Sequence, residues 1–80
     1  MQNKHLVKAI IDVAVFLEFS GEGVLDPDAS IEAMEQLVEE LRCMPEHDKN
    51  EVAECIRGWA NDYAERADFV NDLPENLGLE

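Results

Sequence analysis

Residues 6–19, LVKAIIDVAVFLEF, form the longest apolar run in the chain and decide which fold it can adopt. The charged residues inside this run are Lys8, Asp12 and Glu18. Lys4, Lys8 and Asp12 are spaced four residues apart. That spacing draws one narrow polar line along a helix and leaves the rest of its circumference apolar. We therefore expect a helix that lies at the centre of the fold or in a dimer interface.

The apolar positions of this helix are expected to face the interior. The central stripe is Leu6, Ile10, Val13 and Leu17, and Val7, Ile11, Ala14 and Val15 widen it. A β-strand is the alternative, because many of these residues are β-branched and favour extended structure. The run exceeds the usual length of a strand, however, and its polar residues do not alternate strictly with the apolar ones. The prediction is therefore a helix.

Two basic residues, Lys4 and Lys8, lie at the start of this segment, as they do in secretory signals. Asp12 interrupts the part that such signals keep apolar, so we do not expect export. The run is also shorter than the ~20 apolar residues of a transmembrane helix, so we expect no membrane span.

Cys43 and Cys55 are too few for a disulfide-rich scaffold, and we expect them to be reduced thiols in a cytoplasmic protein.

The 80 residues are expected to form a single domain, 1–80, because no linker or internal repeat divides them. Asp26, Pro27 and Asp28 mark the start of a second helix, since aspartate caps free amides and proline suits the first helical position. This helix is predicted to run to about Cys43. Its buried stripe is predicted to be Ile31, Met34, Leu37, Val38 and Leu41.

A third predicted helix starts at about Glu46 and carries Val52, Ile56, Trp59 and Tyr63 on one face. We expect Trp59 and Tyr63 to belong to the core, with an exposed binding anchor as the alternative. After Arg66 the pattern weakens, so residues 67–73 either continue this helix or form a short fourth one that Pro74 stops. The tail leucines, Leu73, Leu77 and Leu79, are apolar enough to fold back onto the core. The predicted fold is all-α, a small three- to four-helix bundle.

Charge limits the class of partner. The chain has 6 basic and 19 acidic residues, and its formal net charge is -13. Nucleic acid is not expected as a direct ligand, because its binding depends on cations that neutralise phosphates. A basic surface on another protein is the natural complement, and electrostatic attraction would accelerate the encounter. The alternative is that these carboxylates only keep the protein soluble.

The sequence predicts no catalytic site, metal site or cofactor. A calcium-binding loop starting at Asp26 would need glycine where Ile31 stands and a bidentate glutamate where Leu37 stands. The two cysteines and His47 lack the short paired spacing of structural zinc sites. No signature links a nucleophile to a base, and no glycine-rich phosphate loop is present. We therefore expect a protein that is not an enzyme.

The candidate partner-binding residues are carboxylates on and around the second helix, on the side opposite its apolar stripe. Glu32, Glu35, Glu39 and Glu40 form the predicted acidic ridge, Asp26 and Asp28 extend it at the helix start, and Glu46 and Glu51 join it across the second turn.

In size, charge and predicted helix content, the chain resembles the small immunity proteins with which bacteria neutralise their own toxins. The resemblance concerns the class of protein and includes no residue motif, so it transfers no functional residue. It implies a non-enzymatic protein that covers the basic cleft of a toxin, such as a nuclease, with an acidic surface. Two alternatives remain. One is a phage or plasmid inhibitor that mimics the charge of nucleic acid, and the other is a homodimeric helical adaptor with residues 6–19 at its seam.

Overall fold

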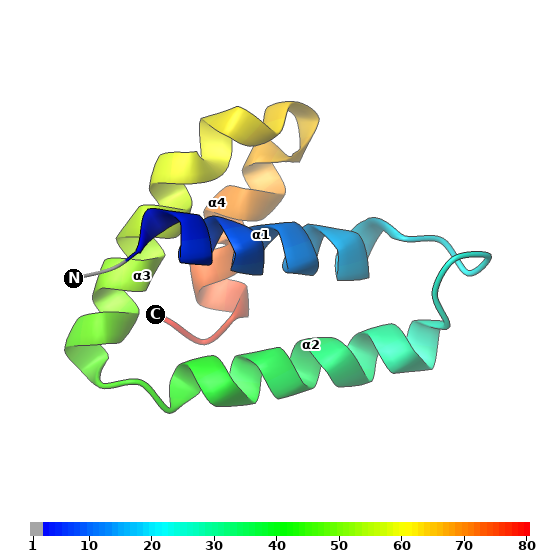
Figure 1. Cartoon of the computed structure of the whole chain (residues 1–80), viewed down its shortest axis with the longest axis horizontal. Coiled ribbons are helices and arrows are strands. Elements are labelled where there is room, and N and C mark those ends of the chain that lie inside the picture. Colours follow the sequence, from blue (N-terminus) through cyan, green and yellow to red (C-terminus); the bar gives the residue numbers. More distant parts are fainter. Residues whose placement is uncertain (1–2) are drawn as a thin grey trace.

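The structure, a computed structural model, describes residues 3–80. Its helices are α1 (Lys4–Phe19), α2 (Pro27–Arg42), α3 (Glu46–Trp59) and α4 (Ala67–Asn76), and a 3-10 segment, η1 (Ala60–Arg66), joins α3 to α4 (Figure 1). The described residues include no strand, so the all-α prediction is confirmed. The predicted count of three to four helices is roughly matched, because α3, η1 and α4 follow one another without a loop as one bent segment. None of the described helices is long and apolar enough to cross a membrane.

Local capping explains where the first two helices begin. The side chain of Asn3 accepts hydrogen bonds from the backbone amides of His5 and Leu6, at 3.0 and 3.3 Å, and so starts α1. Asp26 accepts from the amide of Ala29 at 3.0 Å, and Pro27 follows it at the first position of α2. The predicted start of the second helix is therefore confirmed.

The buried face of α1 differs from the predicted stripe. Its buried residues are Val7, Ile11, Ala14 and Leu17. Leu6 and Val13, which were placed at the centre of the stripe, are 63% and 50% exposed, and Ile10 is only half-buried. The helix is rotated about its axis relative to the predicted orientation, so the prediction of its buried face was wrong. A helix that is apolar on most sides has several faces of similar hydrophobicity that can pack against its neighbours.

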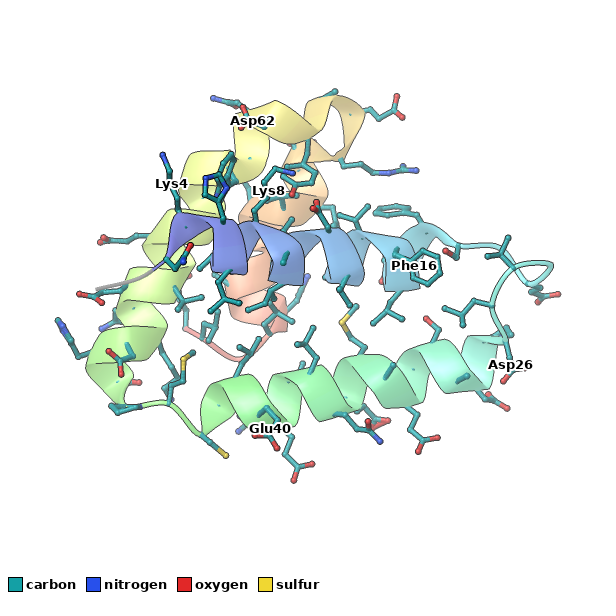
Figure 2. All side chains as sticks on the ribbon, viewed as in Figure 1. Lys4, Lys8, Phe16, Asp26, Glu40 and Asp62 are labelled. Atoms are coloured by element: carbon teal, nitrogen blue, oxygen red, sulfur yellow. The ribbon has the colours of Figure 1, made fainter. Side chains whose placement is uncertain are left out.

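The polar line of α1 contacts the aromatic side chains of the bent segment. The indole Nε1 of Trp59 donates to the backbone oxygen of Lys4 at 3.0 Å. The Lys8 ammonium lies 5.7 Å from the centre of the Trp59 ring and 5.1 Å from that of Tyr63. Figure 2 shows Lys4 and Lys8 on the side of α1 that faces α3 and η1. Both aromatic residues are half-buried against the core.

The tail folds back onto the core, as predicted. Its buried residues are Val70, Leu73, Pro74, Leu77 and Leu79. The amide of Leu79 donates to the backbone oxygen of Pro74 at 2.8 Å, which closes a turn around Gly78. Pro74 does not stop the helix as predicted, because α4 continues to Asn76. Proline has no backbone amide, so the last turn of α4 has one hydrogen bond fewer, and the Pro74 side chain is buried in the core.

Helix α2 is covered on one side only. It packs on α1, where the Ser30 hydroxyl donates to the backbone oxygen of Leu17 at 2.6 Å. Only Leu41 of the predicted buried stripe is buried. Met34, Leu37 and Val38 are half-buried, and Ile31 is 60% exposed. The prediction of a fully buried stripe was wrong, because α4 packs on α3 and η1 rather than on α2, which lies at the edge of the molecule (Figure 1).

Candidate functional site

Four carboxylates form a continuous line along the outer face of α2. Asp28, Glu32, Glu35 and Glu39 follow one another at spacings of four, three and four residues, and all four are exposed. These spacings place successive side chains on one face of an α-helix. We call this line, Asp28, Glu32, Glu35 and Glu39, the α2 ridge.

Two further predicted residues, Glu40 within α2 and Asp26 at its N-cap, lie beside the ridge. Glu40 is exposed, but it follows Glu39 by one residue and so points about 100° away from it. Asp26 lies at the opposite end of the helix from Glu40 (Figure 2). Its carboxylate already accepts the amide of Ala29, so part of its role is to cap the helix.

The remaining two predicted residues, Glu46 and Glu51, belong to α3. Glu46 pairs with Lys49, with Lys49 Nζ 3.1 Å from Glu46 Oε2. Glu51 Oε1 lies 3.1 Å from Nε2 of His47. The structure thus gathers four of the eight predicted residues in one line, places two beside it, and puts two on another helix next to basic side chains.

The basic residues of the chain lie mostly away from the α2 ridge. Lys8 pairs with Asp12 at 3.4 Å, Arg57 pairs with Glu80, and Arg66 lies 3.7 Å from the ring centre of Phe19. Arg42, in the last turn, is the only basic residue of α2. Within residues 3–80, no ridge carboxylate takes part in an ion pair or a side-chain hydrogen bond. Within the described residues, the ridge carboxylates are therefore not neutralised by an ion pair, although Arg42 lines the same groove as Glu35 and Glu39.

An open groove of about 570 Å³ borders the ridge. It is lined by Met34, Glu35, Val38, Glu39, Arg42 and Asn76. Met34 and Val38 supply apolar surface, while Glu35 and Glu39 belong to both the groove and the ridge. The spacing of Met34 and Val38 predicts core positions, since a core stripe and a groove floor have the same helical spacing.

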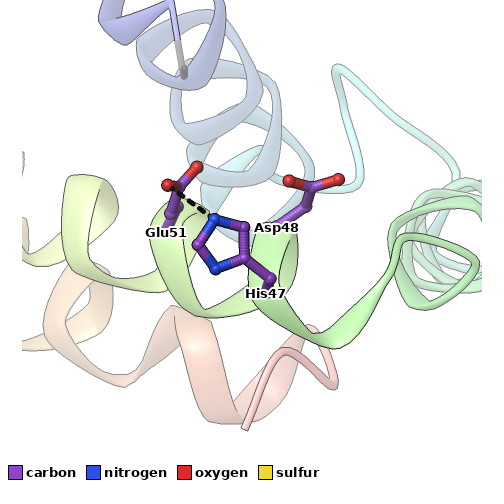
Figure 3. A group of neighbouring side chains, drawn as sticks. All are labelled: His47, Asp48 and Glu51. Carbon is purple, nitrogen blue, oxygen red and sulfur yellow. Dashed lines mark ion pairs between the residues drawn. The ribbon is translucent and has the colours of Figure 1, made fainter.

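A second cluster of polar side chains lies in the first turns of α3 (Figure 3). One ligand atom from each of His47, Asp48 and Glu51 lies within 4.8 Å of the others. His47 is thus grouped with two acids rather than with Cys43 and Cys55, the residues weighed with it from the sequence. The imidazole–carboxylate pair at i,i+4 and the preference of Asp48 for a helix N-terminus explain the cluster without an ion. The donor set, one exposed and two half-buried residues, would also suit a divalent cation.

Comparison with known proteins yields no relative from which a site could be transferred. No protein-family model matches the chain, and no curated protein or solved structure is significantly similar to it. The candidate site therefore depends on the geometry and charge of the α2 ridge and its groove.

Proposed function

We propose that this protein is a non-enzymatic protein-binding module, and that it acts in the cytoplasm of a bacterium as an immunity protein. Its partner would be a toxin whose substrate cleft is basic, and the α2 ridge would cover that cleft. The observation that supports this proposal is the line of exposed ridge carboxylates with no ion pair inside the described chain. Charges left unpaired on one face are available to a partner of opposite sign.

Long-range attraction and short-range contact would have separate sources on this face. The ridge would steer a basic partner and accelerate association, because uncompensated charge raises the encounter rate. The groove beside it would then supply apolar contact through Met34 and Val38. Such a combination of charged rim and apolar centre is typical of specific protein interfaces. Blocking of the cleft would be both steric and electrostatic.

The test is capture of the partner from the native host with two matched charge-reversed variants. Glu35→Lys with Glu39→Lys changes the ridge, whereas Glu54→Lys with Glu65→Lys makes the same change in net charge on exposed residues of α3 and η1. The wild type and the second variant should retain a basic protein, and the first should lose it while keeping its helical circular dichroism. Equal retention by both variants would refute the ridge as the contact.

Two further readouts separate the proposed function from its alternatives. Association with the retained protein should slow as ionic strength rises, because salt screens the ridge. The retained protein should lose its toxic activity when the wild type is added at equimolar amount. Retention of a phage-defence nuclease rather than a toxin would support the inhibitor alternative instead.

A further inference from the structure

The groove beside the α2 ridge carries charges of both signs in a fixed order. Glu35, Glu39 and Arg42 all line it, at spacings of four and three residues along α2. These spacings put the three side chains on one face of the helix, in the order acid, acid, base. All three are exposed, and within residues 3–80 none of them takes part in an ion pair. The charge pattern of the groove is therefore available to a partner.

The segment that follows α4 sets the position of the basic end. It passes the C-terminal end of α2, where the backbone of Gly78 lies so close that an added Cβ would be 2.8 Å from Arg42 Cδ (Figure 1). The aliphatic stem of Arg42 therefore packs on this turn. Asn76, the last residue of α4, lines the groove as well. The positive charge at this end is thus positioned by tertiary packing.

The floor of the groove is apolar. Met34 and Val38, one turn apart on α2, are half-buried against the core and line the groove between its charges. Methionine is flexible and polarizable, so it can adapt to apolar side chains of different shape. From Met34 to Arg42 the groove follows about two turns, or about 12 Å, of α2. An apolar floor of this length with charged edges suits one face of an amphipathic helix.

We propose that the groove binds an amphipathic helix of the partner protein, with two basic side chains one turn apart and an acidic side chain a further turn along. This inference rests on the proposed function and adds the element of the partner that makes the contact. The basic pair would lie against Glu35 and Glu39, and the acid against Arg42. An apolar side chain between them would contact Met34 and Val38. A uniformly basic helix would place a like charge against the guanidinium, so the charge order gives specificity beyond attraction to an acidic surface.

Fluorescence anisotropy with labelled peptides and the full chain tests the charge order. Alanine-rich peptides of about 20 residues are long enough to be helical in isolation. Two matched peptides carry leucines on one face and lysine, lysine and glutamate at i, i+4 and i+7, written in either chain direction. A central-acid peptide has the same composition, with the glutamate between the two lysines. The wild type should bind the better matched peptide about 3- to 10-fold more tightly than the central-acid one, because two exposed charge pairs change from attractive to repulsive.

Variants of the chain assign this preference to the groove. In Arg42→Glu the groove has three acids, so the matched and central-acid peptides should bind equally well. Arg57→Glu makes the same change in net charge on α3 and should keep the preference of the wild type. Met34→Gln should weaken binding of both kinds of peptide, whereas Val24→Gln, at a residue 72% exposed in the turn, should not. Circular dichroism checks that each variant is folded.

Three outcomes would overturn the proposal: no measurable binding of either matched peptide, equal binding of the central-acid peptide to the wild type, or a preference that survives Arg42→Glu. Each is distinguishable from failure of the proposed function. If the preference is absent but Glu35→Lys with Glu39→Lys still loses the captured protein, the groove inference is wrong and the ridge remains the contact. If the preference is present but the captured protein is not a toxin, helix binding by the groove stands and the immunity role is wrong.

Discussion

Tyr63 donates a hydrogen bond from its hydroxyl to Asp12, with Oη 2.5 Å from Oδ1, and this contact joins η1 to α1. Burial raises the pKa of the Tyr63 phenol well above its ordinary value, and the hydrogen bond and negative charge of Asp12 raise it further. Lys8 pairs with the same carboxylate at 3.4 Å and lies over the Tyr63 ring. Lys8 and Asp12, on the polar line of α1, thus make tertiary contacts while remaining partly exposed to solvent.

Tyr63→Phe should reduce the free energy of unfolding by about 1 kcal/mol, because it removes a hydrogen bond to a charged acceptor that is partly solvated. For a domain of this size, the melting temperature would fall by about 4–8 °C. Urea unfolding followed by tryptophan fluorescence measures the loss. The control is the same substitution in an Asp12→Asn background, where the loss should be smaller. An equal loss in both backgrounds would show that Asp12 is not the partner that matters.

Alkaline pH should destabilise the protein through Tyr63. Because its pKa is raised in the folded state, the folded protein holds this proton more tightly than the unfolded chain does. The corresponding stability is fully present below the ordinary tyrosine pKa of 10.0 and is lost as pH rises above it. Tyr63 is the only tyrosine in the sequence, so phenolate absorbance reports on it alone. Phenolate that appears near pH 10 in the still-folded protein would contradict the hydrogen bond from Tyr63 to Asp12.

Ile11 and Val13, two positions apart on α1, should respond differently to truncation. Ile11 is fully buried, so Ile11→Ala should cost about 2–5 kcal/mol of unfolding free energy. Val13 is half exposed, so Val13→Ala should change the stability of the monomer by less than about 0.5 kcal/mol. Chemical unfolding at the same low protein concentration measures both losses. Equal losses would mean that α1 is rotated from the orientation described above.

Two glycines should respond in opposite directions to alanine. Gly78 has a φ of +75°, and a Cβ there would lie 2.8 Å from Cδ of Arg42, so Gly78→Ala should destabilise by about 1–3 kcal/mol. Gly58 lies within α3 with no neighbouring atom within 4 Å of an added Cβ, so Gly58→Ala should stabilise by about 0.5–1 kcal/mol. Thermal melts of the two variants give the signs directly, and a stabilising Gly78→Ala would contradict the turn at the end of α4.

Much of the local structure could be predicted without coordinates. The cap at Asp26 and Pro27, the long helix over residues 6–19 and the apolar tail all depend on interactions between residues close in sequence or on simple apolar content. The line of acids on α2 could be predicted for the same reason, since helical spacing alone places Glu32, Glu35 and Glu39 together. The groove beside them could not, because its walls include Asn76, from the far end of the chain.

The amino-acid sequence by itself determined the helical class, the helix starts and the strongly acidic charge, since these follow from periodicity, capping chemistry and composition. Only the tertiary structure decided which side of α1 faces the core, and thereby exposed Leu6 and Val13 rather than Ile11. It also left the apolar stripe of α2 half covered. The physical reason is that burial of apolar area is non-directional, so a helix that is apolar on most sides is oriented by the shapes of its neighbours and not by its own pattern.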